Sequence, residues 1–447
     1  MAPLTVDRAE LKAELWSAID RQAGDIEGFG RDIFEHPELG FREQRTATQV
    51  AEALRGLGFA VTEGLALTGV RAELQGARPG PTIGIIGELD ALPVPGHPFA
   101  DPVTSAAHAC GHNAQLAHLL GVAQALRATE MAGRLAGRIV FLAVPAEEYV
   151  DLEWRSQQAR RGTIEFLGGK PELVRLGVFD DIDIAMMVHA SGNAGDEPLS
   201  IHWNYNGFIA KRVRFIGQAA HAGVAPFRGV NALNAATLAL SAIHLQRETF
   251  RDEDRIRVHP IVTHGGSAVN VVPADVRLET FVRGATIEAI ADAAAKVDRA
   301  LQAGALAVGA DVEIDTLPGY FPLVMDRELG AFFRANARAL VGAANWAESA
   351  VCNACTDAGD LSQIMPMLHP NHGGCVGFNH TEDFAIVDPA TAYVTPAKAL
   401  AATVIDLLAG AAEGARDVLA AFKPALTRDG YLRRIRGLTG TRRFSYR

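Results

Sequence analysis

The chain has 447 residues, of which 49% are hydrophobic and 21% charged, and its formal net charge is −10. This composition is typical of a globular protein of two or three domains, and the negative charge argues against nucleic acid or an anionic membrane surface as a partner. Four cysteines are too few for a disulfide framework. We expect no signal peptide and no membrane span, and therefore a cytoplasmic protein with reduced cysteines.

Helices are expected first along the chain. Residues 9–58 carry apolar side chains at helical spacing, interrupted by the sequence HPELG at 36–40. Four short, continuously apolar runs follow, at 82–87, 138–144, 183–188 and 374–378. Such runs, separated by helical segments, predict an α/β fold with a mostly parallel sheet flanked by helices.

Residues 204–318 have a different pattern. The expected order of strand, helix, two strands, helix and strand is that of a ferredoxin-like α+β unit. As an insertion, this lid or dimerisation domain makes the catalytic domain discontinuous, with parts at 1–203 and 319–447. The basic tail at 428–447 is expected to be draped over the surface or disordered.

Side chains that can bind metals follow the apolar runs. Polar groups just beyond the carboxyl ends of parallel strands lie where such sheets bind ligands. The motif HACGH at 108–112 adds a thiol and an imidazole around a flexible glycine. Thiolate, imidazole and carboxylate suit zinc, manganese or cobalt. The candidate donors are Cys110, His112, Glu147, Glu148, His189 and His380.

The adjacent Glu147 and Glu148 are expected to have separate roles. In an extended or turning backbone their side chains diverge, so that one can face the metal and the other the substrate. A carboxylate beside a metal-bound water is a natural general base, because the ion lowers the pKa of that water towards ~7.

Further motifs extend this pattern over nearly the whole chain. They lie at 36–41 (HPELGF), 90–93 (DALP), 108–112 (HACGH), 145–148 (PAEE), 220–223 (AHAG), 265–273 (GGSAVNVVP) and 377–384 (GFNHTEDF). With them, the chain resembles the dinuclear-metal aminoacylase and carboxypeptidase family. It is most similar to the branch that contains hippurate hydrolases, indole-acetyl-amino-acid hydrolases and p-aminobenzoyl-glutamate hydrolases.

The resemblance implies a role for each residue of the metal centre. Glu147 would be the general base that later passes a proton to the leaving nitrogen. Asp90 would orient a ligand imidazole or the bound water, and Asn113 would support the ligands from behind in the same way. One or two divalent ions, manganese or zinc, would be held by Cys110, His112, Glu148, His189 and His380.

The resemblance also implies roles for the inserted domain. His221 would reach the active site of the partner subunit in a homodimer and stabilise the developing oxyanion. Asn270 would be a second polar donor from this domain. Arg283 would pair with a carboxylate of a small-molecule substrate, because a guanidinium binds a carboxylate bidentately. The equal alternative is an exposed strand residue with no such role.

The chain departs from this branch near the ligands. Asn113 and Gln115 stand where the branch usually has Asp and His, and Glu88 stands where it usually has Asp. Residues 149–170 form a long insertion after Glu148. If its helix packs over the mouth of the site, Trp154 and Arg155 become candidate substrate contacts. The favoured alternative is that they belong to a helix face packed on the sheet.

These features predict a metal-dependent hydrolase that cleaves a carbon–nitrogen bond, the amide of an N-acyl or N-aroyl amino acid or of a similar carboxylate. The departures support an alternative, a hydrolytic deaminase that releases ammonia from a substituted aminobenzoate. In that case Trp154 would line an aromatic pocket, and Arg155 or Arg283 would hold the carboxylate. A non-catalytic binding protein on the same fold is less favoured, because every ligand and base position has a competent residue.

Overall fold

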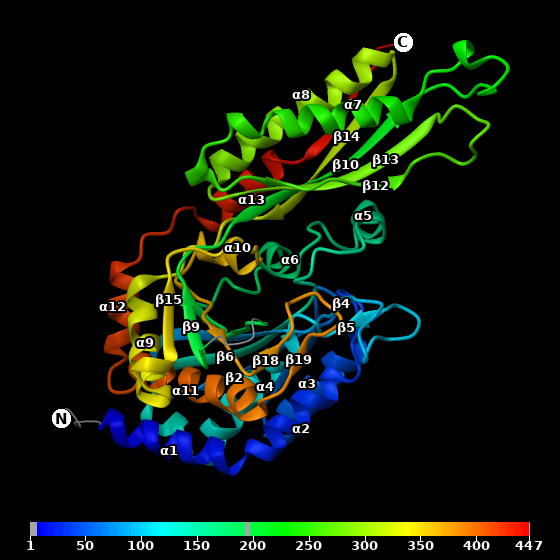
Figure 1. Cartoon of the computed structure of the whole chain (residues 1–447). Coiled ribbons are helices and arrows are strands. Elements are labelled where there is room, and N and C mark those ends of the chain that lie inside the picture. The colour runs from blue at the N-terminus through cyan, green and yellow to red at the C-terminus, as the bar shows by residue number, and fades with distance from the viewer. Residues whose placement is uncertain (1–6, 193–196, 447) are drawn as a thin grey trace. The chain divides into compact units, whose positions relative to one another are not determined.

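The computed structural model describes residues 7–192 and 197–446 and divides into two compact units (Figure 1). Unit 1 comprises residues 1–204, 324–351 and 360–425, and unit 2 comprises residues 205–323, 352–359 and 426–447. Residues 1–6, part of the stretch for which we predicted no signal peptide, lie outside the described residues. Each helix within the described ranges is too short or too polar to cross a membrane.

The N-terminal part of unit 1 is helical, as predicted. Asp7 caps the first helix by accepting hydrogen bonds from the amides of Ala9 and Glu10. The chain breaks away from helical structure after Phe34, in the HPELG segment. The helices are α1 (Arg8–Arg21), α2 (Ala23–Phe34) and α3 (Gln44–Gly56).

A six-stranded sheet forms the centre of unit 1 and confirms the α/β prediction. Four of its strands, β6, β3, β7 and β16, run parallel, whereas β2 and β1 are antiparallel to their neighbours. The buried strands are continuously apolar because helices cover them. In sheet order the strands are β1 (Val61–Leu65), β2 (Gly69–Gln75), β6 (Ala136–Val144), β3 (Arg78–Glu88), β7 (Ile184–Met186) and β16 (Met367–Leu368).

Helices of unit 1 pack on this sheet and on one another. The long, almost fully buried α4 lies against β3 and contacts α1, α2 and α11, and α3 lies on β2 (Figure 1). Helix α10 begins in unit 2 and ends in unit 1. The bounds are α4 (His112–Ala128), α5 (Leu152–Arg160), α6 (Gly169–Leu176), α9 (Arg327–Val341), α10 (Ala358–Ser362), α11 (Thr395–Leu408) and α12 (Glu413–Ala421).

One predicted strand of the sheet is wrong. The apolar run at 374–378 contributes only the two-residue β18 (Cys375–Val376), which pairs with β19 (Ala385–Ile386) outside the central sheet. Gly374 and Gly377 have φ values of 81° and 75°, which end the extended backbone on both sides of this pair. The fourth parallel position is taken by β16 instead.

Short strands complete unit 1. A four-stranded sheet joins segments that are far apart in the sequence, and one of its parallel pairs brings residues 371–372 beside residues 189–190. Its strands are β15 (Trp346–Ser349), β9 (Leu199–His202), β17 (Asn371–His372) and β8 (His189–Ala190), and a separate hairpin consists of β4 (Leu92–Pro93) and β5 (Ala106–Ala107).

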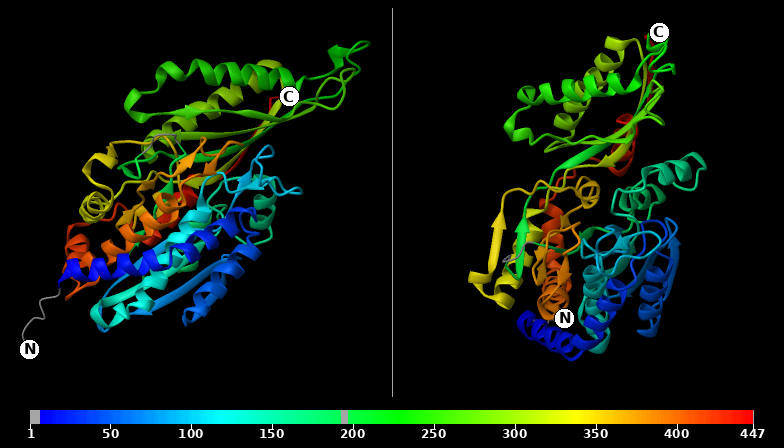
Figure 2. Two further views of the ribbon diagram at one scale, coloured as in Figure 1. Left: turned by 60° about the horizontal axis from the view of Figure 1, so that its bottom comes forward. Right: turned by 45° about the vertical axis from the view of Figure 1, so that its right-hand side comes forward.

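Unit 2 contains an antiparallel sheet with the order β11-β13-β10-β14-β20, and β12 also pairs with β13. Its helices α7 and α8 lie on one face of this sheet in both views of Figure 2, and apolar side chains fill the layer between them. The elements are β10 (Gly207–Ile216), α7 (Ala232–Leu245), β11 (Arg257–Val258), β12 (Ile261–His264), β13 (Asp275–Gly284), α8 (Ile287–Val308) and β14 (Asp311–Tyr320).

The basic tail is an ordered part of unit 2, whereas we expected a draped or disordered segment. We also assigned it to the catalytic domain, but it belongs with the inserted domain in unit 2. Helix α13 (Arg428–Gly437) buries Tyr431 completely, edge-on to the ring of Phe321. Strand β20 (Gly440–Phe444) then pairs with β14. The tail is ordered because its backbone pairs with the otherwise open edge of β14 and its apolar side chains pack against the core of unit 2.

Candidate metal centre

The candidate site lies in unit 1, at the edge where the parallel strands end. The chain leaves β3 towards Asp90 and leaves β6 towards Glu147 and Glu148, and His189 follows β7. Helix α4 begins at His112. Gly111 before it has a φ of 78°, and a Cβ atom there would lie 2.4 Å from the Cβ of Ala190, so this turn requires glycine.

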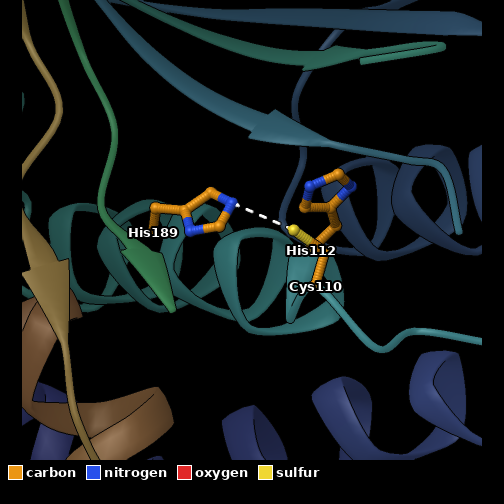
Figure 3. Close-up of side chains that lie close together, drawn as sticks. All are labelled: Cys110, His112 and His189. Atoms are coloured by element: carbon orange, nitrogen blue, oxygen red, sulfur yellow. Dashed lines mark hydrogen bonds between the residues drawn. The ribbon is translucent and has the colours of Figure 1, made fainter. Parts of the chain in front are cut away.

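Two groups of donors share one thiol. Cys110 forms one group with His112 and His189, drawn in Figure 3, and another with Glu148 and His380. Its Sγ lies 3.4 Å from Nε2 of His189 and 3.4 Å from Nε2 of His380. Within each group the donor atoms lie within 4.8 Å of one another. Because Cys110 belongs to both groups, one thiolate can bridge two ions.

A third group contains a residue that we had noted only as a departure from the family branch. It consists of Glu88, His112 and Glu147. Nε2 of His112 lies 3.0 Å from Oε2 of Glu88 and 3.9 Å from Oε2 of Glu147. Glu147 and Glu148 therefore diverge as expected, since Glu148 faces His380, with Oε1 3.1 Å from Nε2.

Backbone and carboxylate contacts orient the donors. Nδ1 of His112 bonds the carbonyl of Asp90 at 2.8 Å, and Nδ1 of His189 bonds the carbonyl of Ala190 at 2.8 Å. These bonds place the ring protons on Nδ1, so that both Nε2 atoms offer lone pairs. Oδ2 of Asp90 accepts a hydrogen bond from the amide of Glu148 at 2.8 Å, which fixes the turn that carries the glutamates.

Unsatisfied atoms show that this donor set fits a cation. Nε2 of His112 and Oε1 of Glu148 are buried, and within residues 7–192 and 197–446 neither has a hydrogen-bond partner. A proton or a metal ion must occupy these positions, because a buried lone pair without a positive partner is costly. Soft thiolate with imidazole and carboxylate is the donor chemistry of zinc, manganese or cobalt.

The anionic donors of the site are stabilised by nearby positive charge. Burial and the Glu148 carboxylate raise the pKa of the Cys110 thiol, but His189, His380 and His112 together lower it further, so that the net pKa lies well below its usual value. Glu148 raises the pKa of His380, opposed by desolvation. Without an ion, protons on the imidazole Nε2 atoms balance the anionic donors. A divalent ion that displaces these protons supplies the same charge and leaves the Nε2 lone pairs to bind it.

Other predicted residues of unit 1 lie behind the site. Asn113 is buried, and its Nδ2 donates to the carbonyl of Gly30 and to the hydroxyl of Tyr393, both at 3.0 Å, so it anchors α4 and belongs to none of the three donor groups. The ring of Trp154 lies under the guanidinium of Arg42, 4.4 Å from its centroid.

Arg155 does not have the exposure that a substrate contact needs. Its side chain is buried, and Nη1 donates to the carbonyl of Leu167 at 2.7 Å. The guanidinium also lies 5.3 Å from the ring centroid of Phe41. Arg155 therefore packs inside unit 1 and ties the inserted segment to the turn at Phe41, which agrees with the favoured expectation of a packed helix face.

His221, Asn270 and Arg283 belong to unit 2. His221 is exposed, and its Nδ1 accepts hydrogen bonds from the amides of Gly223 and Val224, so its Nε2 carries the proton and can donate. Asn270 lies on an exposed loop. Arg283 contacts the rings of Phe208 and Phe281, and its Nη1 donates to Sγ of Cys355 at 3.5 Å.

Comparisons with known proteins place these observations in a family. Residues 84–406 match peptidase family M20/M25/M40. The chain is similar to the Xaa-Arg dipeptidase of Mus musculus, with 29% identity over 95% of this chain and 93% of that protein. It is also 29% identical to the N-acyl-L-amino acid amidohydrolase of Geobacillus stearothermophilus, over 61% of this chain and 70% of that protein.

A solved structure shows the same fold. It is a Bacillus subtilis protein described as a dinuclear metal binding peptidase from the M20 family, with a TM-score of 0.64 and 22% identity over 86% of this chain and 98% of that one. The family resemblance inferred from the sequence motifs is confirmed by these matches.

Proposed function

We propose, because the chain belongs to peptidase family M20/M25/M40, that it uses two divalent ions to hydrolyse the amide bond of an N-acyl amino acid or a dipeptide. Membership of this family makes the chain a hydrolase acting on carbon–nitrogen bonds. The observation that carries the proposal is the pair of donor groups that share the Cys110 thiol. A bridging thiolate must stay reduced, which suits the cytoplasm.

The two ions would be held on either side of Cys110, one with His112 and His189 and one with Glu148 and His380. A bound divalent ion makes water more acidic and stabilises negative charge on a carbonyl oxygen. Glu147, beside His112 but facing away from Glu148, is the side chain in position to take the proton from the attacking water. It can return that proton to the leaving nitrogen, so that the amide nitrogen departs as a neutral amine.

A second copy of the chain would complete the site. His221 is exposed and presents a protonated Nε2, as a donor to a developing oxyanion must. Its loop meets the loop of Asn270 through a bridge between His221 and Val271. Large apolar side chains on these two loops, among them Phe227 at 81% exposure and the fully exposed Val269, are suited to burial in a homodimer.

For the aminobenzoate alternative, the described residues offer no specific support. Arg155, one of the two arginines expected to hold the ring carboxylate, bonds Leu167 instead. Arg283 remains a candidate for the substrate carboxylate in either reaction, since its guanidinium is partly exposed above two aromatic rings. The amide therefore stands as the proposed scissile bond.

The test is a product assay on protein loaded with manganese or zinc. N-acyl amino acids, N-aroyl amino acids, dipeptides and aminobenzoates are incubated separately, and free amino acid and ammonia are measured in each. We expect free amino acid from an acylated amino acid or a dipeptide. Glu147→Gln should lower the rate by about 10²–10⁴-fold, the usual contribution of a general base.

The matched control is Glu153→Gln, which removes a carboxylate on the exposed side of the neighbouring helix α5 and should keep the wild-type rate. Ammonia from an aminobenzoate with no release of amino acid would refute the amide proposal. A Glu147→Gln protein with the wild-type rate would remove this residue from the role of base.

A further inference from the structure

An ion pair lies buried behind the metal donors. Glu88 and Lys170 both have no exposed surface, and Nζ of Lys170 bonds Oε1 of Glu88. Gln115 clamps the same glutamate twice, since its Nε2 donates to Oε2 of Glu88 at 2.7 Å and its Oε1 accepts from the backbone amide of Glu88 at 3.2 Å. Burying an ion pair costs free energy of desolvation, so this pair is weak evidence for stability and suggests a role at the neighbouring site.

The carboxylate oxygen that Gln115 holds also faces a metal donor. Oε2 of Glu88 lies 3.0 Å from Nε2 of His112, both side chains are fully buried, and yet the geometry is not that of a hydrogen bond: Nε2 of His112 is unsatisfied among the described residues. Two atoms that bind one ion at about 2.0–2.2 Å lie about 2.8–3.6 Å apart, over the range from right-angled to tetrahedral geometry. The pair has the spacing of two ligands of a common ion.

The same arrangement occurs across the thiol. Oε1 of Glu148 lies 3.1 Å from Nε2 of His380, and Oε1 has no hydrogen-bond partner in the described part of the chain. Each side of Cys110 therefore has one carboxylate oxygen facing one imidazole nitrogen at close range. Only the Glu148 side was expected from the sequence motifs.

We infer that Glu88 is an additional ligand of the ion held by Cys110, His112 and His189, and that Lys170 and Gln115 position it. The inference rests on the proposed function, because it concerns the same metal centre. Lys170 occupies Oε1 and Gln115 fixes Oε2, so the carboxylate cannot rotate away from His112. Lys170 comes from the end of the insertion at 149–170, which gives that segment a part in the metal centre.

The test is metal titration of chelator-treated protein with Mn²⁺ or Zn²⁺ by calorimetry, checked by elemental analysis. The wild type should bind two ions per chain. Glu88→Gln should weaken one of them at least tenfold and leave the other unchanged, while Glu148→Gln should weaken the other. In Co²⁺-loaded protein, Glu88→Gln should alter the visible ligand-field spectrum without removing the thiolate charge-transfer band.

The matched control is Glu172→Gln, which removes another buried glutamate, paired with Arg175, that belongs to none of the three donor groups. If Glu88→Gln does not fold because it leaves Lys170 uncompensated, the double variant Glu88→Gln with Lys170→Met removes both charges together and carries the same prediction. Two ions bound with wild-type affinities by either Glu88 variant would overturn the inference and leave the proposed function intact. A wild type that binds no ion would overturn both.

Discussion

Glu43 offers a quantitative test of the electrostatics around the site. Its carboxyl group is fully buried and accepts hydrogen bonds from the hydroxyl of Thr68 at 2.6 Å and from the amide of Ala146 at 2.8 Å. Burial, together with the nearby charge of Asp90, raises the pKa of Glu43 from 4.5 to about 7. Glu43 thus fixes the turn at Ala146, before Glu147 and Glu148, but ionisation of its buried carboxyl group is unfavourable.

The sign of the effect follows from proton counting. Between pH 4.5 and about 7 the folded chain holds a proton on Glu43 that the unfolded chain has released, so stability falls as the pH rises through this window. At 1.36 kcal/mol per pKa unit, the loss above pH 7 approaches about 3 kcal/mol. Glu43→Gln keeps an acceptor for Ala146 and cannot ionise. It should therefore be more stable than the wild type above pH 7, by up to about 3 kcal/mol, and equal to it near pH 4.5.

The assay is urea unfolding of chelator-treated protein at several pH values from about 5 to about 8, with the midpoint and slope compared at each. Glu153→Gln, which changes an exposed carboxylate, should follow the wild-type curve throughout. Parallel stability curves for wild type and Glu43→Gln would show that Glu43 titrates with an ordinary pKa, and the argument from burial would fail.

Three further outcomes are expected. Cys110→Ser replaces the shared thiolate with a poor ligand and should lower the occupancy of both ions, and unchanged metal content by elemental analysis would remove Cys110 from the ligand set. His221→Ala and an enforced monomer should each lower kcat by about 10²–10³-fold, whereas a monomer with full turnover would contradict the dimer-completed site. Tyr431→Ala opens a cavity beside Phe321 and should cost about 3–5 kcal/mol in unfolding of unit 2, and an unchanged melting curve would show that the tail is dispensable.

The central sheet was predictable because its buried strands leave a local signature. A strand covered on both faces is apolar at every position, so the runs at 82–87, 138–144 and 183–188 identified β3, β6 and β7. The run at 374–378 has the same composition but fails, since Gly374 and Gly377 adopt left-handed conformations that composition does not reveal. Strand β16 is two residues long, too short for periodicity to detect.

The site was predictable to the extent that its donors follow strand ends. Glu147, Glu148 and His189 were found by that rule, and Glu88, the last residue of β3, obeys it as well. Its partner could not be found this way, because Lys170 lies 82 residues away in an insertion with no strand of its own. The role of Arg155 stayed open between a substrate contact and a packed helix face for a related reason. Whether a long cationic side chain is exposed or buried depends on tertiary packing that the sequence pattern does not contain.

The insertion at 149–170 supports the metal centre from behind. Ala146, just before the two glutamates, has a φ of 54°, a conformation that a residue with a Cβ holds only when its neighbours enforce it. Its amide donates to Glu43, and its carbonyl accepts from the amide of Gly169 at 3.0 Å. A Cβ on Gly169 would lie 1.6 Å from the carbonyl oxygen of Pro145, so the chain can return this closely only with glycine there. The next residue is Lys170. The close return that holds the turn of Glu147 and Glu148 therefore also brings the ammonium group to Glu88. A change in this insertion should alter all three carboxylates of the site together.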